Sequence, residues 1–391
     1  MHAGRQQYQG AAGECVRRDH APGRVLAAAG ARAGADPCPA RHPRGRPAGR
    51  QWSGRRARHP ERGALAGLPG RRPGGRLGAG RQVGARRTSV KHGLEIDGST
   101  PVLVQGITGR AARLHTGLMR RYGTHIVAGT SAGKSVQAGA DVDGVPVFTD
   151  CKAAVLATGA RASIAMVPPL AVLGAVREAI DAGIGLIVTI AEGVPVHDAM
   201  KVKRMADEAG VRWVGASTPG LCVPGQIKLG FLPDVALKPG PLGVMSKSGT
   251  LSYEVCYRLA RRGIGQSAWI GVGGDLVKGT RFADLLPFFG ERDDTRAVLA
   301  VGEIGGTEEE ELALALQHSG FGKPVFVLLA GAQAKEGVTM GHAGALVHGD
   351  TGTLQSKRAA LLKAGARVHT NIEALVADVC TAAMDLEIPS L

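Results

Sequence analysis

His342 is the residue of this chain whose neighbours best suit it to form a covalent intermediate. It lies in the run Met340-Gly341-His342-Ala343-Gly344-Ala345, where small side chains leave the imidazole ring uncovered. Imidazole is a nucleophile as well as a proton carrier, so such a ring can accept a transferred group. The alternative is an ordinary loop residue in a glycine-rich turn, and this run alone does not decide between the two.

Three turns that end strand-like runs are candidates for binding a phosphate group. The first is Gly106-Ile107-Thr108-Gly109, the second contains Lys134, and the third is Ile190-Ala191-Glu192-Gly193. Free backbone N–H groups and the positive end of a helix dipole meet at such turns, which suits an anion. The spacing GxGxxG of dinucleotide-binding proteins is absent, and each turn is also compatible with an ordinary strand-to-helix connection.

Short apolar runs alternate with segments of helical periodicity from about Val90 onward. Runs that are apolar throughout, each followed by a helix, are typical of parallel strands covered on both faces. There are too many runs for one open sheet, and Pro-Gly pairs favour a boundary near residue 222. We therefore predict an α/β fold of two doubly wound domains, over residues 91–222 and 223–391. The expected strands include 102–104, 126–127, 145–148, 164–167, 186–190, 242–245, 269–272, 298–301 and 325–329, and the expected helices 170–182, 197–209, 251–262, 307–318 and 353–364.

Residues 1–90 differ sharply in composition from the rest of the chain. They hold nineteen arginines and four acidic residues, which accounts for the entire net charge of +15. The remainder is balanced, so electrostatics gives no reason to expect nucleic-acid binding by the folded part. Arg, Gly, Ala and Pro dominate residues 1–90 without apolar periodicity, which predicts disorder. A basic tail, an organelle-targeting peptide and an unnatural reading frame of GC-rich DNA remain open, and we favour the last.

Cysteine usage and hydropathy favour an intracellular location. The six cysteines are scattered, without CxxC or zinc-binding spacing, so we expect neither a disulfide framework nor a metal site. No apolar run reaches the roughly eighteen residues that a membrane span needs, and no signal-peptide core precedes the fold. We expect a cytoplasmic protein, or one of the mitochondrial matrix if its source is eukaryotic.

Seven motifs, in order and between about Glu95 and Asp385, resemble those of the α subunit of succinyl-CoA synthetase and related ADP-forming acyl-CoA ligases. No single motif is decisive, but their order and spacing make a chance match improbable. The motifs are 105–109 (Gln-Gly-Ile-Thr-Gly), the turn at Lys134, 192–195 (Glu-Gly-Val-Pro), 246–254 (Ser-Lys-Ser-Gly-Thr-Leu-Ser-Tyr-Glu), 271–275 (Gly-Val-Gly-Gly-Asp), 302–306 (Gly-Glu-Ile-Gly-Gly) and 340–345 (Met-Gly-His-Ala-Gly-Ala).

The resemblance implies a Rossmann-like CoA-binding domain followed by a flavodoxin-like ligase domain. It implies a reaction through an acyl phosphate and a phosphohistidine at His342, with capture of the acyl group by coenzyme A as a thioester. The chain has no P-loop pattern and no recognisable ATP-grasp domain. A separate β subunit is therefore expected to hold ATP or GTP with Mg²⁺, in a heterodimer or a heterotetramer.

The resemblance also implies roles for the residues that match the motifs. Glu303 would pair with one ring nitrogen of His342 and leave the other free to attack phosphorus. Tyr253 would contact the acid substrate. A phosphohistidine needs N–H donors, which Ser248, Gly249 and Thr250 would supply at the start of a helix. The expected CoA contacts are Thr108, Gly109, Arg110, Ala111, Lys134, Ile190, Ala191 and Glu192.

Several motifs depart from the family's usual sequence, chiefly at the expected CoA and acid contacts. Arg110-Ala111-Ala112 replaces Ser-Gln-Gly, and Lys247 replaces an arginine, which forfeits bidentate phosphate binding. Ser217-Thr218 replaces Asn-Cys near the expected acid site. These hydroxyl groups either bind a hydroxy acid or only shape the turn. We expect the reaction type to be kept, with succinate, malate, citrate or another acid as substrate.

Two rival functions are compatible with the predicted fold. A nicotinamide dehydrogenase would need GxGxxG and an acidic residue about twenty positions later, and this fingerprint is absent. A catalytically silent CoA-binding regulatory relative would keep the fold but not the chemistry. The altered turns leave this second rival open, whereas His342 and Glu303 argue against it.

Overall fold

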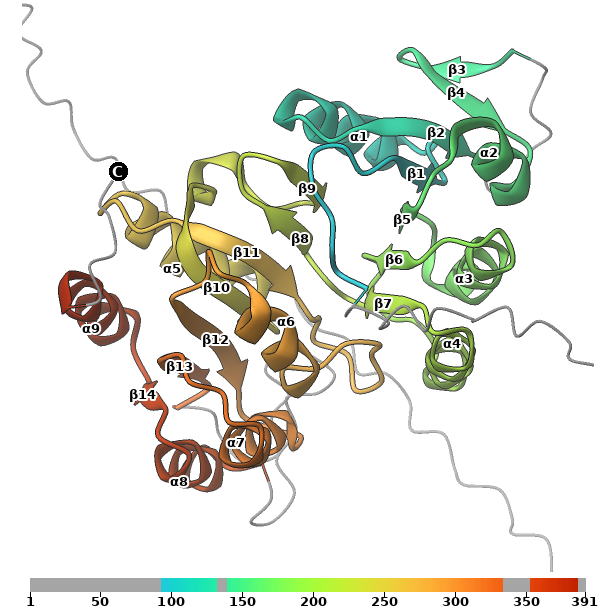
Figure 1. Ribbon diagram of the computed structural model, residues 1–391. Helices are drawn as coiled ribbons and strands as arrows, with labels where there is room; N and C mark the ends of the chain where they lie inside the picture. The colour runs from blue at the N-terminus through green and yellow to red at the C-terminus, as the bar shows by residue number, and fades with distance from the viewer. Residues whose placement is uncertain (1–92, 132–138, 333–351, 386–391) are drawn as a thin grey trace, which may run out of the picture. The chain divides into compact units, whose positions relative to one another are not determined.

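The computed structural model describes residues 93–131, 139–332 and 352–385, which form two seven-stranded sheets with flanking helices (Figure 1). The expected disorder of residues 1–90 lies outside these ranges. So do the predictions that concern Lys134 and His342. The α/β fold class with two wound sheets is confirmed.

The first sheet has the strand order of a Rossmann fold. Its order is β3-β4-β2-β1-β5-β6-β7, and neighbouring strands are parallel except β3 and β4. The chain builds from β1 to one edge and then from β5 to the other, which creates a switch point between β1 and β5. The strands are β1 Val102–Gln105, β2 Ile126–Thr130, β3 Asp141–Val142, β4 Val145–Phe148, β5 Ala162–Ala165, β6 Leu186–Thr189 and β7 Arg212–Gly215.

Helices cover both faces of the first sheet because its central strands are apolar on both sides. Val102 and Val104 of β1 share a core with Met119 of α1, whereas Leu103 shares one with α2, α3 and α4. Gly123, in the left-handed region with φ 109°, ends α1. The helices are α1 Arg110–Tyr122, α2 Cys151–Thr158, α3 Val172–Asp181 and α4 Val196–Ala209, with a 3-10 turn at Pro169–Ala171.

The second sheet has a flavodoxin-like parallel part and an antiparallel hairpin. Its order is β14-β13-β12-β10-β11-β8-β9, in which β10 to β14 pair in parallel and place a switch point between β10 and β12. The hairpin β8–β9 pairs antiparallel to β11, which the sequence did not predict. The strands are β8 Gly220–Val223, β9 Ile227–Gly230, β10 Pro239–Ser246, β11 Gln266–Gly271, β12 Ala297–Glu303, β13 Val325–Ala330 and β14 Arg367–His369.

Two groups of helices pack on opposite faces of the second sheet. Trp269 and Phe326 face a core shared with α5 and α9, whereas Val298 and Ala300 face a core shared with α6, α7 and α8. Figure 1 shows the same division of helices about this sheet. The helices are α5 Gly249–Ala260, α6 Leu286–Glu291, α7 Glu308–His318, α8 Leu354–Lys363 and α9 Ile372–Asp385, with 3-10 turns at Asp234–Ala236 and Ala283–Leu285.

Helix α1 and the hairpin β8–β9 connect the two sheets. The Thr124 hydroxyl donates to Lys228 O at 2.7 Å and accepts from Lys228 N at 3.0 Å. The Tyr122 hydroxyl accepts from Gly225 N at 3.1 Å. The predicted boundary near residue 222 falls inside β8, a strand of the second sheet.

Two further features of the described residues are the apolarity of the helices and the state of the cysteines. Within the described ranges, no helix combines the length and apolarity that crossing a membrane would require. The thiols of Cys151, Cys222, Cys256 and Cys380 are free. Burial raises the pKa of the Cys151 and Cys222 thiols to about 12, so both stay protonated at neutral pH.

Candidate functional site

The turn after β1 lies at the switch point of the first sheet. Gly106 has φ 78°, and a Cβ atom there would lie 2.7 Å from the carbonyl oxygen of Met166 after β5. The Thr108 hydroxyl is hydrogen-bonded to that of Ser131, after β2, at 3.0 Å. Gly109 is the N-cap residue of α1 and supplies no side-chain cap. The first N–H groups of α1 are therefore left for a ligand or water.

The expected CoA contacts in the described part lie at one edge of the first sheet. Arg110 and Ala111 are exposed in the first turn of α1. Ile190, Ala191 and Glu192 follow β6, which is separated from β1 only by β5. Carboxyl ends of parallel strands share an edge, so both groups border the region in which ligands of this fold bind.

The start of α5 holds the three residues that the sequence predicts to form a phosphate cradle. Ser248 is the N-cap residue, and its hydroxyl accepts from Leu251 N at 3.4 Å. Gly249 and Thr250 are the first residues of the helix, so their N–H groups have no partner within it. Strand β10 ends two residues earlier, at the switch point of the second sheet.

Tyr253 lies over the first turn of α5, one turn after the cradle. A Cβ atom on Gly249 would lie 3.3 Å from the Tyr253 hydroxyl oxygen. The ring contacts Trp269 edge-on, with centroids 5.9 Å apart. Burial raises the pKa of Tyr253 to about 12, so at neutral pH its hydroxyl remains a hydrogen-bond donor.

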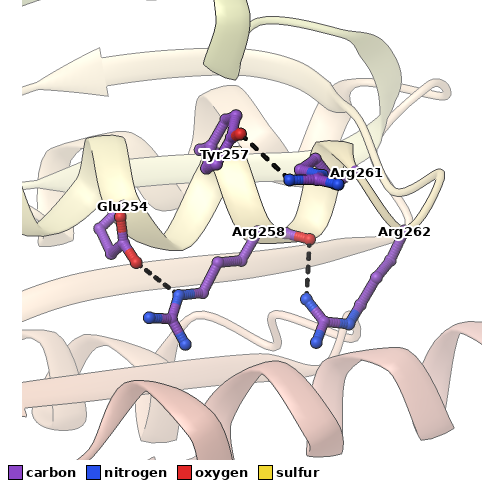
Figure 2. A pocket seen from close by; sticks show the side chains of 5 residues that line it. All are labelled: Glu254, Tyr257, Arg258, Arg261 and Arg262. Atoms are coloured by element: carbon purple, nitrogen blue, oxygen red, sulfur yellow. Dashed lines mark hydrogen bonds and ion pairs between the residues drawn. The ribbon is translucent and has the colours of Figure 1, made fainter. Parts of the chain in front are cut away.

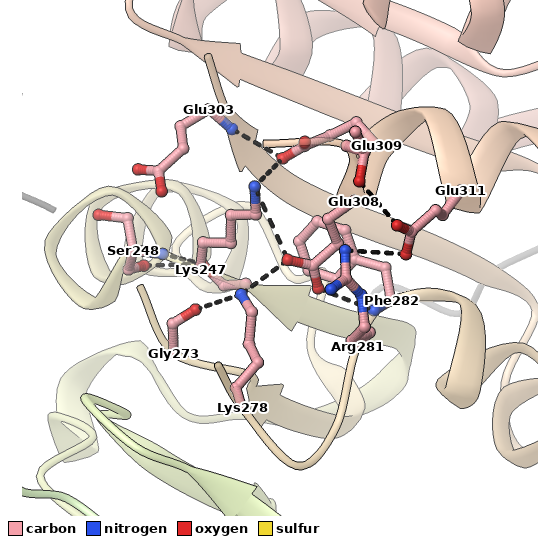
Figure 3. Close-up of polar contacts among 12 residues, drawn as sticks. Lys247, Ser248, Gly273, Lys278, Arg281, Phe282, Glu303, Glu308, Glu309 and Glu311 are labelled. Carbon is pink, nitrogen blue, oxygen red and sulfur yellow. Dashed lines mark hydrogen bonds and ion pairs between the residues drawn. The ribbon is translucent and has the colours of Figure 1, made fainter. Parts of the chain in front are cut away.

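Glu303 ends β12, on the other side of the same switch point. Its side chain is buried, and it lines a cavity of about 160 Å³ beside the loop that follows β11. Figure 3 shows its carboxylate on the side of Ser248. The residues that line the cavity are Lys247, Gly274, Asp275, Leu276, Lys278, Arg281, Glu303, Gly306, Thr307 and Glu308.

The described residues on either side of the segment that contains His342 contact the turn of Glu303. Glu303 pairs with Ala330, the last residue of β13, and Ile304 N donates to Ala330 O at 3.1 Å. At the other end, Gly305 N donates to Gly352 O at 2.8 Å. Ala330 and Gly352, which lie on either side of residues 333–351, are therefore both bonded at the turn that carries Glu303. The contact between His342 and Glu303 itself stays a prediction.

Lys247 points into a buried cluster of charges. Its side chain is 6% exposed, and its ammonium nitrogen lies 2.8 Å from Glu309 Oε1 and 3.7 Å from Glu308 Oε2. The sequence suggested that lysine in place of arginine weakens phosphate binding. In the structure, the ammonium group of Lys247 instead pairs with carboxylates inside the protein (Figure 3).

Sequence reasoning missed most of this cluster. Lys278 bonds Glu308 Oε2 at 2.7 Å and Gly273 O at 2.7 Å, and Lys357 pairs with Glu309. Glu308 and Glu309 lie in α7, Lys357 lies in α8, and Lys278 lies in the loop after β11. Four consecutive glutamates at the start of a helix resemble a solvated surface that complements the helix dipole, which is why the sequence gave no signal.

A second hollow, of about 510 Å³, lies along the later turns of α5 (Figure 2). Arg258 bonds Glu254 and Glu373, Arg261 donates to the Tyr257 hydroxyl at 3.3 Å, and Arg262 donates to Arg258 O at 3.1 Å. These arginines complement the negative end of the helix, opposite to the end that forms the cradle.

Comparison with known proteins agrees with the geometry. The CoA binding domain matches residues 97–193 and the CoA-ligase domain residues 245–367. Subunit α 2 of the ADP-forming succinate–CoA ligase of Archaeoglobus fulgidus is 46% identical over 273 residues, which is 70% of this chain and 93% of that protein. This chain belongs to the succinate–CoA ligase α-subunit family. The resemblance noted in the sequence is confirmed.

One relative is named for another acid. The ADP-forming sulfoacetate–CoA ligase subunit of Bilophila wadsworthia is 43% identical over 270 residues, which is 68% of this chain and 91% of that protein. The fold alone is shared with ATP citrate lyase from Methanothrix soehngenii, solved with citrate and coenzyme A. The TM-score is 0.67 at 22% identity, over 75% of this chain and 52% of that one.

Proposed function

We propose that this chain is the α-type subunit of a nucleotide-dependent carboxylate–CoA ligase that works through a phosphohistidine at His342. The convergence at the β10/β12 switch point carries the proposal. The start of α5 and Glu303 lie there beside one small cavity, and Ala330 and Gly352, on either side of the segment that contains His342, are bonded to the turn of Glu303. A phosphoryl group on histidine needs concentrated N–H donors, and Gly249 and Thr250 offer them.

In the proposed reaction, a ring nitrogen of His342 attacks the γ-phosphorus of ATP or GTP, and the nucleoside diphosphate leaves. Glu303 accepts the N–H of the other ring nitrogen, which fixes the tautomer and stabilises the cationic ring. A carboxylate oxygen of the acid then attacks phosphorus, which frees His342 and forms an acyl phosphate. The CoA thiolate attacks the acyl carbonyl, and inorganic phosphate leaves.

Coenzyme A and the nucleotide bind at different places in this proposal. Coenzyme A binds at the β1/β5 switch point, where Thr108, Gly109 and the first N–H groups of α1 face its phosphates. Lys134 supplies a cation to the same ligand. The nucleotide and its Mg²⁺ are held by a separate β subunit of the ATP-grasp type, which would complete the enzyme.

The acid substrate is proposed to be short and to carry a second anionic group. Two related subunits are named for succinate and for sulfoacetate, and both acids have that property. Tyr253 stays protonated at neutral pH and lies one turn from the cradle, so it can donate a hydrogen bond to such an acid. The pair Ser217-Thr218 gives a hydroxy acid less support, because the backbone of the protein itself binds the Thr218 hydroxyl.

Phosphate labelling tests the proposal. The chain, reconstituted with the β chain of its own source, is incubated with γ-³²P ATP and with γ-³²P GTP. We expect acid-labile, base-stable label on His342 and none on His342→Asn, because the amide cannot form a phosphoramidate. CoA affinity, measured by calorimetry, should be nearly unchanged in this variant.

Two outcomes would contradict the proposal. Turnover of His342→Asn within tenfold of the unmodified chain would mean that phosphoryl transfer bypasses this residue. Absence of label from the unmodified complex, with CoA binding intact, would favour the catalytically silent regulatory relative.

A further inference from the structure

We propose that Glu309 is a positioning residue, which holds three segments around the phosphoryl-transfer cavity through one buried carboxylate. The inference rests on the proposed function and goes beyond it, because Glu309 is not among the residues that line the cavity. It acts through the segments that it joins.

The carboxylate of Glu309 is fully buried in the first turn of α7 and uses both oxygens. Oε1 accepts from Glu303 N at 3.0 Å and from Lys247 Nζ at 2.8 Å (Figure 3). Oε2 pairs with Lys357. A Cβ atom on Gly302 would lie 2.5 Å from Oε1. The carboxylate is therefore packed directly against the backbone at the end of β12.

Each partner of Glu309 belongs to a different part of the proposed site. Lys247 directly precedes Ser248, the N-cap residue of the cradle helix. Glu303 is the proposed partner of the histidine. Lys357 lies in the first half of α8, five residues after Gly352, the first described residue that follows the segment that contains His342. The Glu309 side chain thus joins the cradle, Glu303 and the helix α8, which follows the segment that contains His342.

The ionisation of Glu309 supports this role. Burial alone would raise the pKa of its carboxyl group, but the ammonium groups of Lys247 and Lys357 outweigh burial and lower it. Glu309 is therefore an anion at neutral pH and can hold both cations. Attraction within a buried ion pair is largely offset by desolvation, so net stability is a poor reason for the arrangement. The placement of Glu309 among three segments of the site is a better reason for this arrangement.

The test compares two glutamine variants on the same helix, in the full chain with its β chain. Glu309→Gln keeps the shape of the side chain but cannot hold two ammonium groups. We expect His342 labelling by γ-³²P ATP to slow at least tenfold, with the KM for ATP and the CoA affinity changed less than twofold. Glu311→Gln is the matched control, because Glu311 is half-exposed and pairs with Arg281. It should label at the normal rate.

A charge-balanced variant separates positioning from stability. Glu309→Gln combined with Lys357→Met removes one buried anion and one buried cation, so it avoids an unpaired charge if the single variant fails to fold. Slow labelling of this folded double variant supports positioning, whereas recovery to within twofold of the normal rate overturns it. If the unmodified complex never labels at His342, the proposed function fails instead, so the two failures are distinguishable.

Discussion

At the scale of single residues, the protein's own backbone already uses the hydroxyl group of Thr218. The hydroxyl donates to Gly271 O and accepts from Gly220 N at 2.9 Å, and the residue is 3% exposed. Ser217 is half-buried, with φ 55°, and its backbone bonds Ala191 and Gly274. Of the two hydroxyl groups that could recognise a hydroxy acid, only that of Ser217 is therefore available.

Substitution of each hydroxyl residue tests this distinction. Thr218→Val should lower the free energy of unfolding by about 1–3 kcal/mol, because it leaves buried backbone groups without a partner. It should not change the ratio of kcat/KM for succinate to that for malate. Any preference for malate over succinate should depend on Ser217 and be lost in Ser217→Ala.

Competition of succinate, malate and citrate in a CoA-dependent assay measures these ratios. A tenfold preference of the unmodified enzyme for succinate would exclude the hydroxy-acid interpretation. A ratio that shifts with Thr218→Val and not with Ser217→Ala would contradict the roles assigned here.

The residues of the site were only partly predictable from the sequence. Glu303 and the cradle stand in glycine-punctuated motifs at strand ends, where the topology alone places ligands. The partnership of Glu309 with Lys247 and Lys357 spans three separate elements. No local pattern reveals such a pairing, because charged residues on helices are usually solvated.

At the scale of elements, two glycines have the same backbone conformation but differ in how close other atoms lie to them. Gly106 and Gly144 both have φ 78°. A Cβ atom on Gly106 would lie 2.7 Å from Met166 O, whereas one on Gly144 meets nothing within 4 Å. Gly144 lies in the β3–β4 turn, away from the switch point. The turn after β1 therefore needs glycine for space as well as for conformation.

Alanine substitutions at these two positions should differ in their effect on coenzyme A. Both carry a left-handed penalty of roughly 1–2 kcal/mol. Gly106→Ala should in addition displace the turn and weaken CoA binding at least tenfold in calorimetry. Gly144→Ala should bind CoA normally and show only a small loss of thermal stability. Equal CoA affinities for the two variants would remove the turn after β1 from the CoA site.

The sequence predicted elements best where both faces are buried. The expected strand 186–190 matches β6, Leu186–Thr189, to within one residue, because a strand that is buried throughout is apolar and bounded by turns. Helix α9 was missed, since small and apolar residues fill most of its positions and no polar face marks its period. Strand β8 was missed because the Pro-Gly pairs that flank it suggested a boundary rather than a hairpin. The expected strand 164–167 begins two residues earlier, at Ala162.

At the scale of the whole molecule, the described fold begins after residues 1–90. The first family match begins at residue 97, and the first described residue is Gly93. Helix α1 starts at the turn after β1 and ends against the hairpin of the second sheet, where Thr124 and Lys228 are bonded. The contacts between the sheets therefore come from within the described part.

Removal of the basic segment should consequently leave the protein functional. A chain that begins at Val90 should fold, bind coenzyme A and retain its β chain, because residues 1–90 lack a core-forming pattern. Circular dichroism, calorimetry and co-purification check these three properties. Aggregation of the shortened chain, or loss of the β chain, would show that the segment contributes to the fold or to assembly.

The burial of the lysines in and beside the cavity would also protect the protein from the products of the proposed reaction. Acyl phosphates and thioesters, the compounds of the proposed reaction, modify amines that are neutral and accessible. Lys247, Lys278 and Lys357 are nearly inaccessible and are paired with carboxylates. Burial lowers the pKa of Lys278, whereas neighbouring glutamates raise that of Lys247, so Lys278 loses its proton more readily than Lys247, yet its side chain is only 4% exposed. Self-acylation would thus fall on exposed lysines such as Lys201, and the charges that organise the site would survive repeated turnover.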